Sequence, residues 1–183
     1  MRKEILELNQ ILEDIGPNPW EKIPDIDLYI DQVLDYMKRQ HPGLNQKETL
    51  TSSMVNNYAK QGLIPRAKGK KYNREHISSL TVICLLKQII SVGDTKAIIN
   101  AMAKDDHYED LYKTYLTLFS EQATNLMDDL SSCPQPEDIH QLILKMAINS
   151  YLYKFACQYL IDSLEDSKDH SKNESKDDAK EKK

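Results

Sequence analysis

The sequence predicts an all-α protein with one small β-hairpin. Apolar residues recur at helical spacing in most segments, and polar residues that can cap a helix precede several of them. One short lysine-rich stretch instead holds a glycine between two extended arms, which is typical of a hairpin. With 183 residues, of which 40% are apolar and 29% charged, the chain is long enough to bury a hydrophobic core.

Two amphipathic helices are predicted in the N-terminal quarter. The first covers residues 2–15 and is closed by Gly16 and Pro17, and the second covers residues 25–41 and is stopped by Pro42 and Gly43. The segment PNPWEKIPD joins them, and we expect it to be an ordered linker whose tryptophan packs on the domain.

The third predicted helix begins at Thr51 or Ser52 and ends at Gly62, a residue that suits a left-handed cap. At 100° per residue this helix has two separate faces. The apolar face consists of Met54, Val55, Tyr58 and Ala59, and the polar face of Ser53, Asn56, Asn57 and Lys60. The polar face contains no carboxylate, whereas an ordinary solvated face mixes Glu with Lys.

The next segment, RAKGKKY, predicts the hairpin, with its turn at Gly69. Asn73 can cap a long helix over residues 74–90, and Asp94 can cap a shorter one over residues 94–104. The order of helix, helix, hairpin, helix and helix is that of a winged helix-turn-helix.

Two helices and a tail complete the chain. A helix over residues 108–130 carries a tyrosine-rich stripe, and a helix over residues 137–164 is apolar nearly all round, so it needs neighbours within the monomer or across a dimer. Such stripes are typical of a core or a dimer seam, and a ligand pocket is the alternative. The predicted organisation is an N-terminal helix and linker (1–24), a winged-helix domain (25–104), a C-terminal helical region that serves dimerisation or the core (105–165) and a disordered charged tail (166–183).

Charge is distributed unevenly. Six basic residues and one acid between residues 51 and 76 give a local charge of +5, while 18 bases and 28 acids give the remainder −10. A polyanion repels the acidic remainder of the chain and attracts only this stretch. The electrostatic field therefore favours one orientation of the protein, with this stretch facing the polyanion. Positive charge in an acidic protein therefore indicates a negatively charged partner.

Several other functions find little support in the sequence. The five histidines are scattered, no glycine-rich phosphate loop is present, and Cys84, Cys133 and Cys157 have no metal-ligand spacing. We therefore expect no enzyme, no cofactor and no metal. An acidic, amphipathic N-terminus and the lack of a long uncharged apolar run predict neither a signal peptide nor a membrane span. Reduced thiols and a cytoplasmic location follow as expectations.

The stretch MVNNYAKQGLIPRAKGKKYNREHISSLTVICLLKQIISVGDTKAI resembles the MerR-like winged-helix DNA-binding domain. In that family the recognition helix ends in tyrosine, a basic residue and Gly-Leu, and a basic wing ending in tyrosine follows. The matching residues are Tyr58, Lys60, Gly62, Leu63, Lys70, Tyr72, Ile77, Leu80 and Ile83. The chain is also similar to a family of uncharacterised bacterial proteins, a domain of unknown function, that carry LTSSMVNNYAKQGLI and KKYNREHI. It departs from the MerR-like pattern at Asn56-Asn57-Tyr58, where Arg-Tyr-Tyr is usual, and in the longer segment PGLNQKETL.

We therefore expect a bacterial transcriptional regulator, a repressor that binds double-stranded DNA as a homodimer on a pseudo-palindromic site. The recognition helix, residues 52–61, enters the major groove, and the wing, residues 65–72, grips phosphates. The expected DNA contacts are Ser52, Ser53, Asn56, Asn57, Lys60, Arg66, Lys68, Lys70, Lys71, Tyr72 and Arg74. The alternative is a helical adaptor that uses the same basic patch to bind an acidic protein.

Overall fold

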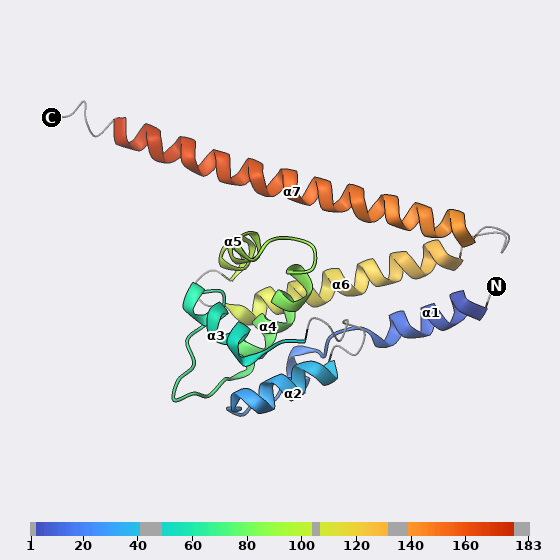
Figure 1. The fold of residues 1–183 in the computed structure, drawn as a ribbon, viewed down its shortest axis with the longest axis horizontal. Coiled ribbons are helices and arrows are strands. Elements are labelled where there is room, and N and C mark those ends of the chain that lie inside the picture. The colour runs from blue at the N-terminus through green and yellow to red at the C-terminus, as the bar shows by residue number, and fades with distance from the viewer. Residues whose placement is uncertain (1–2, 41–48, 104–106, 132–138, 178–183) are drawn as a thin grey trace. The chain divides into compact units, whose positions relative to one another are not determined.

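The structure, a computed structural model, describes residues 3–40, 49–103, 107–131 and 139–177, and side chains through residue 164. The helices are α1 (Lys3–Asp14), the 3-10 turn η1 (Trp20–Lys22), α2 (Ile30–Gln40), α3 (Ser52–Gln61), α4 (Arg74–Leu86), α5 (Val92–Met102), α6 (Tyr108–Ser131) and α7 (Ile139–Asp177) (Figure 1). No β-strand occurs in these described ranges. The predicted all-α class is therefore confirmed for the part of the chain that the structure describes.

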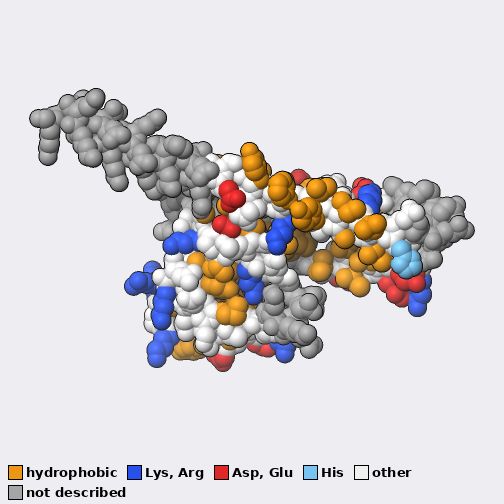
Figure 2. All heavy atoms as spheres, turned by 45° about the horizontal axis from the view of Figure 1, so that its top comes forward, with side chains coloured by type: hydrophobic (Ala, Val, Ile, Leu, Met, Phe, Trp, Pro, Cys, Tyr) orange, Lys and Arg blue, Asp and Glu red, His pale blue; other side chains and the backbone are white. Residues whose placement is uncertain are grey.

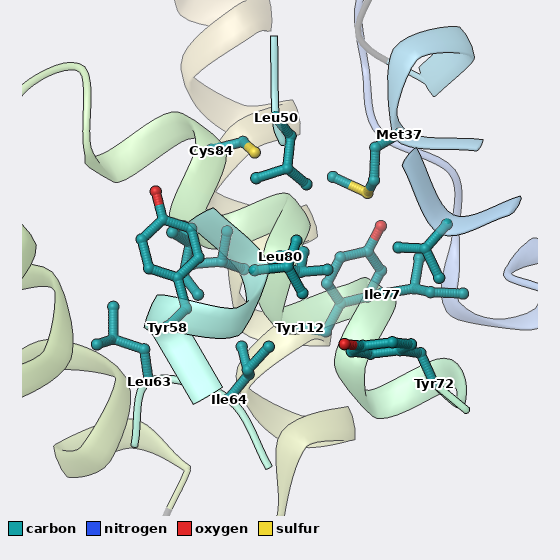
Figure 3. Packing of buried hydrophobic residues seen from close by; sticks show 14 of the residues in the cluster. Met37, Leu50, Tyr58, Leu63, Ile64, Tyr72, Ile77, Leu80, Cys84 and Tyr112 are labelled. Carbon is teal, nitrogen blue, oxygen red and sulfur yellow. The ribbon is translucent and has the colours of Figure 1, made fainter. Parts of the chain in front are cut away.

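The chain divides into two compact units, residues 1–136 and residues 137–183. The core of the first unit surrounds α4, which is buried continuously from His76 to Cys84. Figure 3 shows Ile77, Leu80 and Cys84 of this helix among side chains from α2, α3 and α6. A helix buried on every side is a poor place for hydroxyl groups unless each finds a partner.

The buried hydroxyl groups of α4 bond to the helix itself. Ser78 and Ser79 donate to the carbonyl of Glu75 at 2.9 and 2.8 Å, and Thr81 donates to the carbonyl of Ile77 at 2.9 Å. Each bond satisfies a donor without help from a neighbouring helix. The sequence REHISSLTVICLL can therefore occupy the centre of the unit despite its polar residues.

The N-terminal part of α6 belongs to the same core. Leu111 and Tyr112 are buried in it, and the Tyr112 hydroxyl donates to the carbonyl of Asn18 at 2.6 Å and accepts from Gln40 at 3.4 Å. The predicted domain boundary after residue 104 thus falls inside a compact unit, whose observed division lies after Pro136. Helical periodicity identified α6 correctly but did not indicate which domain its apolar stripe would complete.

The predicted β-hairpin over residues 65–72 is wrong as a pair of strands. The chain reverses in a tight turn that is closed by one bridge, in which the Lys71 amide donates to the Lys68 carbonyl at 3.0 Å. The next residue, Tyr72, exchanges both backbone hydrogen bonds with Leu28, at 2.8 and 2.9 Å. The arms do not continue as a ladder, because Tyr72 pairs with a segment far upstream and Pro65 has no amide hydrogen to donate.

Other element boundaries differ from the predicted ones for local reasons. Helix α2 begins at Ile30, because Leu28 is held extended by its pairing with Tyr72. Helix α5 begins at Val92, since Ser91 caps it by accepting the Asp94 amide at 3.1 Å. Helix α7 continues to Asp177 and so includes much of the predicted disordered tail, of which residues 178–183 lie outside the description.

Candidate nucleic-acid interface

Helix α3 is held at both ends by local hydrogen bonds. At its start the Thr51 hydroxyl accepts from the Met54 amide at 3.2 Å. At its end Gly62 adopts φ 71°, and the amides of Gly62 and Leu63 donate to the carbonyls of Ala59 and Tyr58. This is a left-handed cap that residues with a β-carbon adopt only at a cost, so the predicted function of the glycine is confirmed.

The two faces of α3 separate as their sequence predicts. Val55 and Tyr58 are buried in the core, and Met54 and Ala59 pack against it. The opposite face is exposed along its whole length and consists of Ser52, Ser53, Asn56, Asn57 and Lys60. Within the part of the chain that the structure describes, the one side-chain hydrogen bond on this face is a long one from Gln61 to Asn57 at 3.4 Å. A rigid helix therefore presents amides, hydroxyl groups and one ammonium to solvent.

Beyond α3 the chain forms a projecting basic turn, which we define as residues 65–72 (Figure 1). Its four basic side chains, Arg66, Lys68, Lys70 and Lys71, are all exposed. Gly69 and Lys70 both adopt positive φ, 59° and 62°, which is the geometry of a two-residue reversal. A lysine in this conformation is uncommon, so Lys70 is held at the tip at a modest cost in backbone energy.

Buried residues on both sides fix the base of the basic turn. Leu63 and Ile64 enter it from the core, and Tyr72 leaves it buried, with its ring 5.3 Å from the His76 ring. Among the described residues, no salt bridge within 4 Å involves Lys60 or the four bases of the turn. Lys71 does contact an aromatic ring, since its ammonium lies 5.9 Å from the centre of Tyr29. Within the described ranges, positive charge at this surface is thus largely uncompensated.

Asn73 and His76 close the start of α4 with reciprocal hydrogen bonds. The Asn73 side chain accepts the His76 amide at 3.3 Å, and His76 Nδ1 accepts the Asn73 amide at 3.2 Å. Burial lowers the pKa of His76, and this outweighs the opposing effects of Glu75 and of the Arg66 and Pro65 carbonyls. A neutral imidazole is therefore part of the cap that anchors the basic turn.

Two of the residues that were predicted to contact DNA do not belong to this exposed surface. Tyr72 is only 5% exposed, and its ring belongs to the core (Figure 3). The Arg74 side chain is 21% exposed, and its guanidinium lies 5.5 Å from the Trp20 ring and 3.6 Å from an Asp25 oxygen. Nine of the eleven predicted residues therefore lie on the exposed face of α3 and on the basic turn. Tyr72 instead packs in the core, and Arg74 contacts the linker before α2.

Sequence reasoning missed Tyr29 and Trp20 as neighbours of the basic stretch. Tyr29 is 54% exposed, and it stands beside Lys71 because Leu28 pairs with Tyr72. Trp20 was expected to pack on the domain, and it does so by covering Arg74 and approaching the Tyr112 ring. Neither pairing has a local signal, since the partners are far apart in the sequence.

These features define a small helical protein whose first unit exposes an acid-free polar helix beside a basic turn. The chain belongs to the DUF1836 family, described as a domain of unknown function, whose sequence profile matches residues 18–115. No curated protein and no solved structure matches it significantly. The match includes the start of α6, in agreement with the burial of Tyr112, and excludes α7.

A membrane-spanning helix was not expected. Among the described residues, no helix combines the length and the hydrophobicity that crossing a bilayer requires.

Proposed function

We propose that this protein binds double-stranded DNA with sequence specificity and acts as a bacterial, cytoplasmic transcriptional repressor through a MerR-like winged helix-turn-helix. The observation that carries the proposal is the exposed face of α3. It offers five side chains that can form hydrogen bonds to bases or phosphates, and it has no carboxylate that would repel the phosphates. The apolar face of the same helix is held in the core, so the polar face is presented rigidly.

Helix α3 suits the major groove in both length and chemistry. Its ten residues span about 15 Å, which is comparable to the groove's width of about 12 Å. Asn56 and Asn57 can each bond bidentately to an adenine edge, and Lys60 can reach a guanine or a phosphate. Ser52 and Ser53, at the helix start, can donate to a phosphate beside the free amides of the first turn.

The basic turn supplies sequence-independent affinity in this proposal. Lys68, Lys70 and Lys71 lie within four residues of one another at a projecting reversal, and Arg66 precedes them. Such clusters contact phosphates, release counterions and make binding dependent on salt. The double hydrogen bond between Leu28 and Tyr72 would keep the turn at a constant distance from α3.

Tyr72 and Arg74 serve as anchors in this proposal, and DNA contact rests on the other nine predicted residues. The Tyr72 ring is in the core, and the Arg74 guanidinium is engaged by Trp20 and Asp25. Both residues would then support affinity only by holding the turn in place. The remainder of the chain is acidic and repels a polyanion, so its charge also favours an orientation in which α3 and the basic turn face the DNA.

The test is titration of labelled DNA by fluorescence anisotropy, with a fragment from upstream of the protein's own coding sequence and a random fragment of equal length. We expect saturable binding that is tighter for the upstream fragment and weakens as salt rises. The adaptor alternative predicts no binding to either fragment and co-purification of an acidic protein that the basic turn is needed to retain. That result would overturn the proposal.

A further inference from the structure

The second unit, helix α7, exposes an unusual amount of apolar surface. Ten large hydrophobic side chains between residues 143 and 164 are at least 49% exposed: Ile143, Leu144, Ile148, Tyr151, Leu152, Tyr153, Phe155, Tyr159, Leu160 and Leu164. Figure 2 shows hydrophobic side chains gathered along the part of α7 that precedes the grey residues. Monomeric proteins rarely expose a contiguous apolar patch larger than about 300–600 Å².

The apolar side chains of α7 together expose an area close to that of a standard interface. The four aromatic rings are 62–76% exposed, so they alone offer about 400–700 Å², because a buried aromatic side chain covers about 150–250 Å². Six aliphatic side chains add to this. A standard protein interface buries about 800 Å² on each partner. At 100° per residue the ten side chains lie all round the helix, so a single helix-to-helix contact covers only part of this surface.

The residues along one side of α7 follow a heptad. Positions spaced alternately by three and four residues are Lys145, Ile148, Leu152, Phe155, Tyr159 and Asp162, which we call the seam. All six are exposed, and the four apolar ones are 49–64% exposed. Alternating steps of three and four are the pattern by which one helix packs into another. The seam thus has an apolar centre, a basic N-terminal end and an acidic C-terminal end.

We propose that the seam binds the seam of a second copy of this chain in antiparallel orientation. In that arrangement Leu152 lies opposite Phe155 of the second copy, and Ile148 lies opposite Tyr159 of the second copy. Lys145 then faces Asp162 of the second copy, at both ends of the pair because the contact has two-fold symmetry. One register therefore aligns four apolar layers and two pairs of opposite charges.

A parallel pair does not satisfy the same residues. Equivalent positions would then face each other, so Lys145 would meet its own counterpart and Asp162 would meet its own. Like charges at the ends of an apolar seam act against that pairing and so select the antiparallel one. Within its own helix the Asp162 carboxylate accepts from Gln158 at 2.9 Å, which orients it on the exposed side. The inference rests on α7 alone and does not depend on DNA binding.

Charge reversal in the full chain tests both the partner and the orientation. Sedimentation equilibrium without DNA should find a dimer of the natural chain. Lys145→Glu and Asp162→Lys should each raise the dimer dissociation constant about tenfold, since each creates two like-charge pairs. The double variant Lys145→Glu/Asp162→Lys should restore the natural value within about threefold. Lys154→Glu, the same charge change off the seam, should have little effect.

Each other outcome overturns a stated part of the inference. A natural chain that stays monomeric at high concentration shows that a second copy does not occupy the seam. A dimer that is insensitive to all three seam variants shows that its helices are not antiparallel in this register. A cysteine-free chain with Lys145→Cys and Asp162→Cys should form a 145-to-162 cross-link between subunits under mild oxidation. Cross-linking of either single cysteine variant to itself would indicate a parallel pair.

Discussion

Leu28 and Tyr72 exchange both of their backbone hydrogen bonds, Leu28 N to Tyr72 O at 2.8 Å and Tyr72 N to Leu28 O at 2.9 Å. This pair joins the segment before α2 to the end of the basic turn. It places Tyr29 beside Lys71 and lets Tyr72 enter the core. The position of the basic turn relative to α3 therefore depends on a contact between distant parts of the chain, as well as on the short connection between them.

Asn56 and Asn57 should determine sequence preference. We expect Asn56→Ala or Asn57→Ala to weaken binding to the preferred DNA by about 1–3 kcal/mol at one base pair and to leave random DNA nearly unaffected. Competition anisotropy against single-base variants of the site measures this. Asn100→Ala, an exposed change on α5, is the matched control. Equal losses on preferred and random DNA would assign these side chains to the backbone instead.

Lys70 and Lys71 should contribute affinity without sequence information. Lys70 has φ 62°, so Lys70→Asn, which tolerates that conformation, removes the charge without disturbing the turn. Each lost phosphate contact should reduce the slope of log affinity against log salt by about 0.9, so Lys70→Asn/Lys71→Gln in a dimer should flatten it by up to about four units. Lys22→Gln/Lys38→Gln removes the same charge from exposed sites elsewhere. If both double variants have the natural slope, the basic turn does not hold phosphates.

Arg74 should contribute to the free energy of unfolding and not to the salt dependence of DNA affinity. Its guanidinium lies over the Trp20 ring, while Asp25 is 85% exposed and contributes little as an ion pair. We expect Arg74→Gln to lower the free energy of unfolding by about 0.5–1 kcal/mol in urea denaturation, mainly from the lost ring contact. A folded variant whose salt slope falls by about one unit would instead support the phosphate contact that the sequence predicts.

Stability should fall as the pH decreases through the range in which His76 titrates. Burial lowers its pKa, so the unfolded chain takes up a proton near pH 6.5 before the folded chain does. Stability is then unaffected by His76 at higher pH, declines below about pH 6.5 and levels off below the pKa of the folded state. Each unit of pKa difference contributes about 1.4 kcal/mol.

His76→Gln isolates this dependence. Glutamine at the same position can accept the Asn73 amide in a capping box but cannot titrate. Urea denaturation between pH 8 and pH 5 should therefore show a smaller pH dependence for His76→Gln than for the natural chain. Identical pH dependence in the two chains would contradict a neutral, buried His76.

Truncation should reveal where the first unit ends. A chain that stops after Pro136 should retain a cooperative unfolding transition, and one that stops after Lys104 should not. The shorter chain loses Leu111 and Tyr112 from the core, and truncating one buried aromatic side chain typically costs about 3–5 kcal/mol. Circular dichroism during thermal unfolding measures the difference. Cooperative unfolding of the shorter chain would place the boundary where the sequence predicted it.

Local patterns predicted most of the helices and the polar face of α3. Thr51, Gly62 and the spacing of Val55 and Tyr58 act within one or two turns, and the structure has the same caps and the same buried face. The prediction of a two-stranded hairpin was wrong because Tyr72 pairs with Leu28. No local signal in RAKGKKY indicates such a distant partner. Charge and position on the helix face were enough to predict the DNA-contact residues that the structure shows to be exposed. The same criteria also selected Arg74, because nothing local indicates that its side chain packs against Trp20.

Local sequence is enough to establish which side of α3 is polar, where that helix begins and ends, and that positive charge collects just after it. Those properties depend on helical geometry, on capping hydrogen bonds and on composition, which act over a few residues. Long-range packing instead establishes that Tyr72 pairs with Leu28, that Arg74 lies against Trp20 and that Tyr112 completes the core. Each of these joins residues far apart in the chain, and packing of the whole unit selects such contacts.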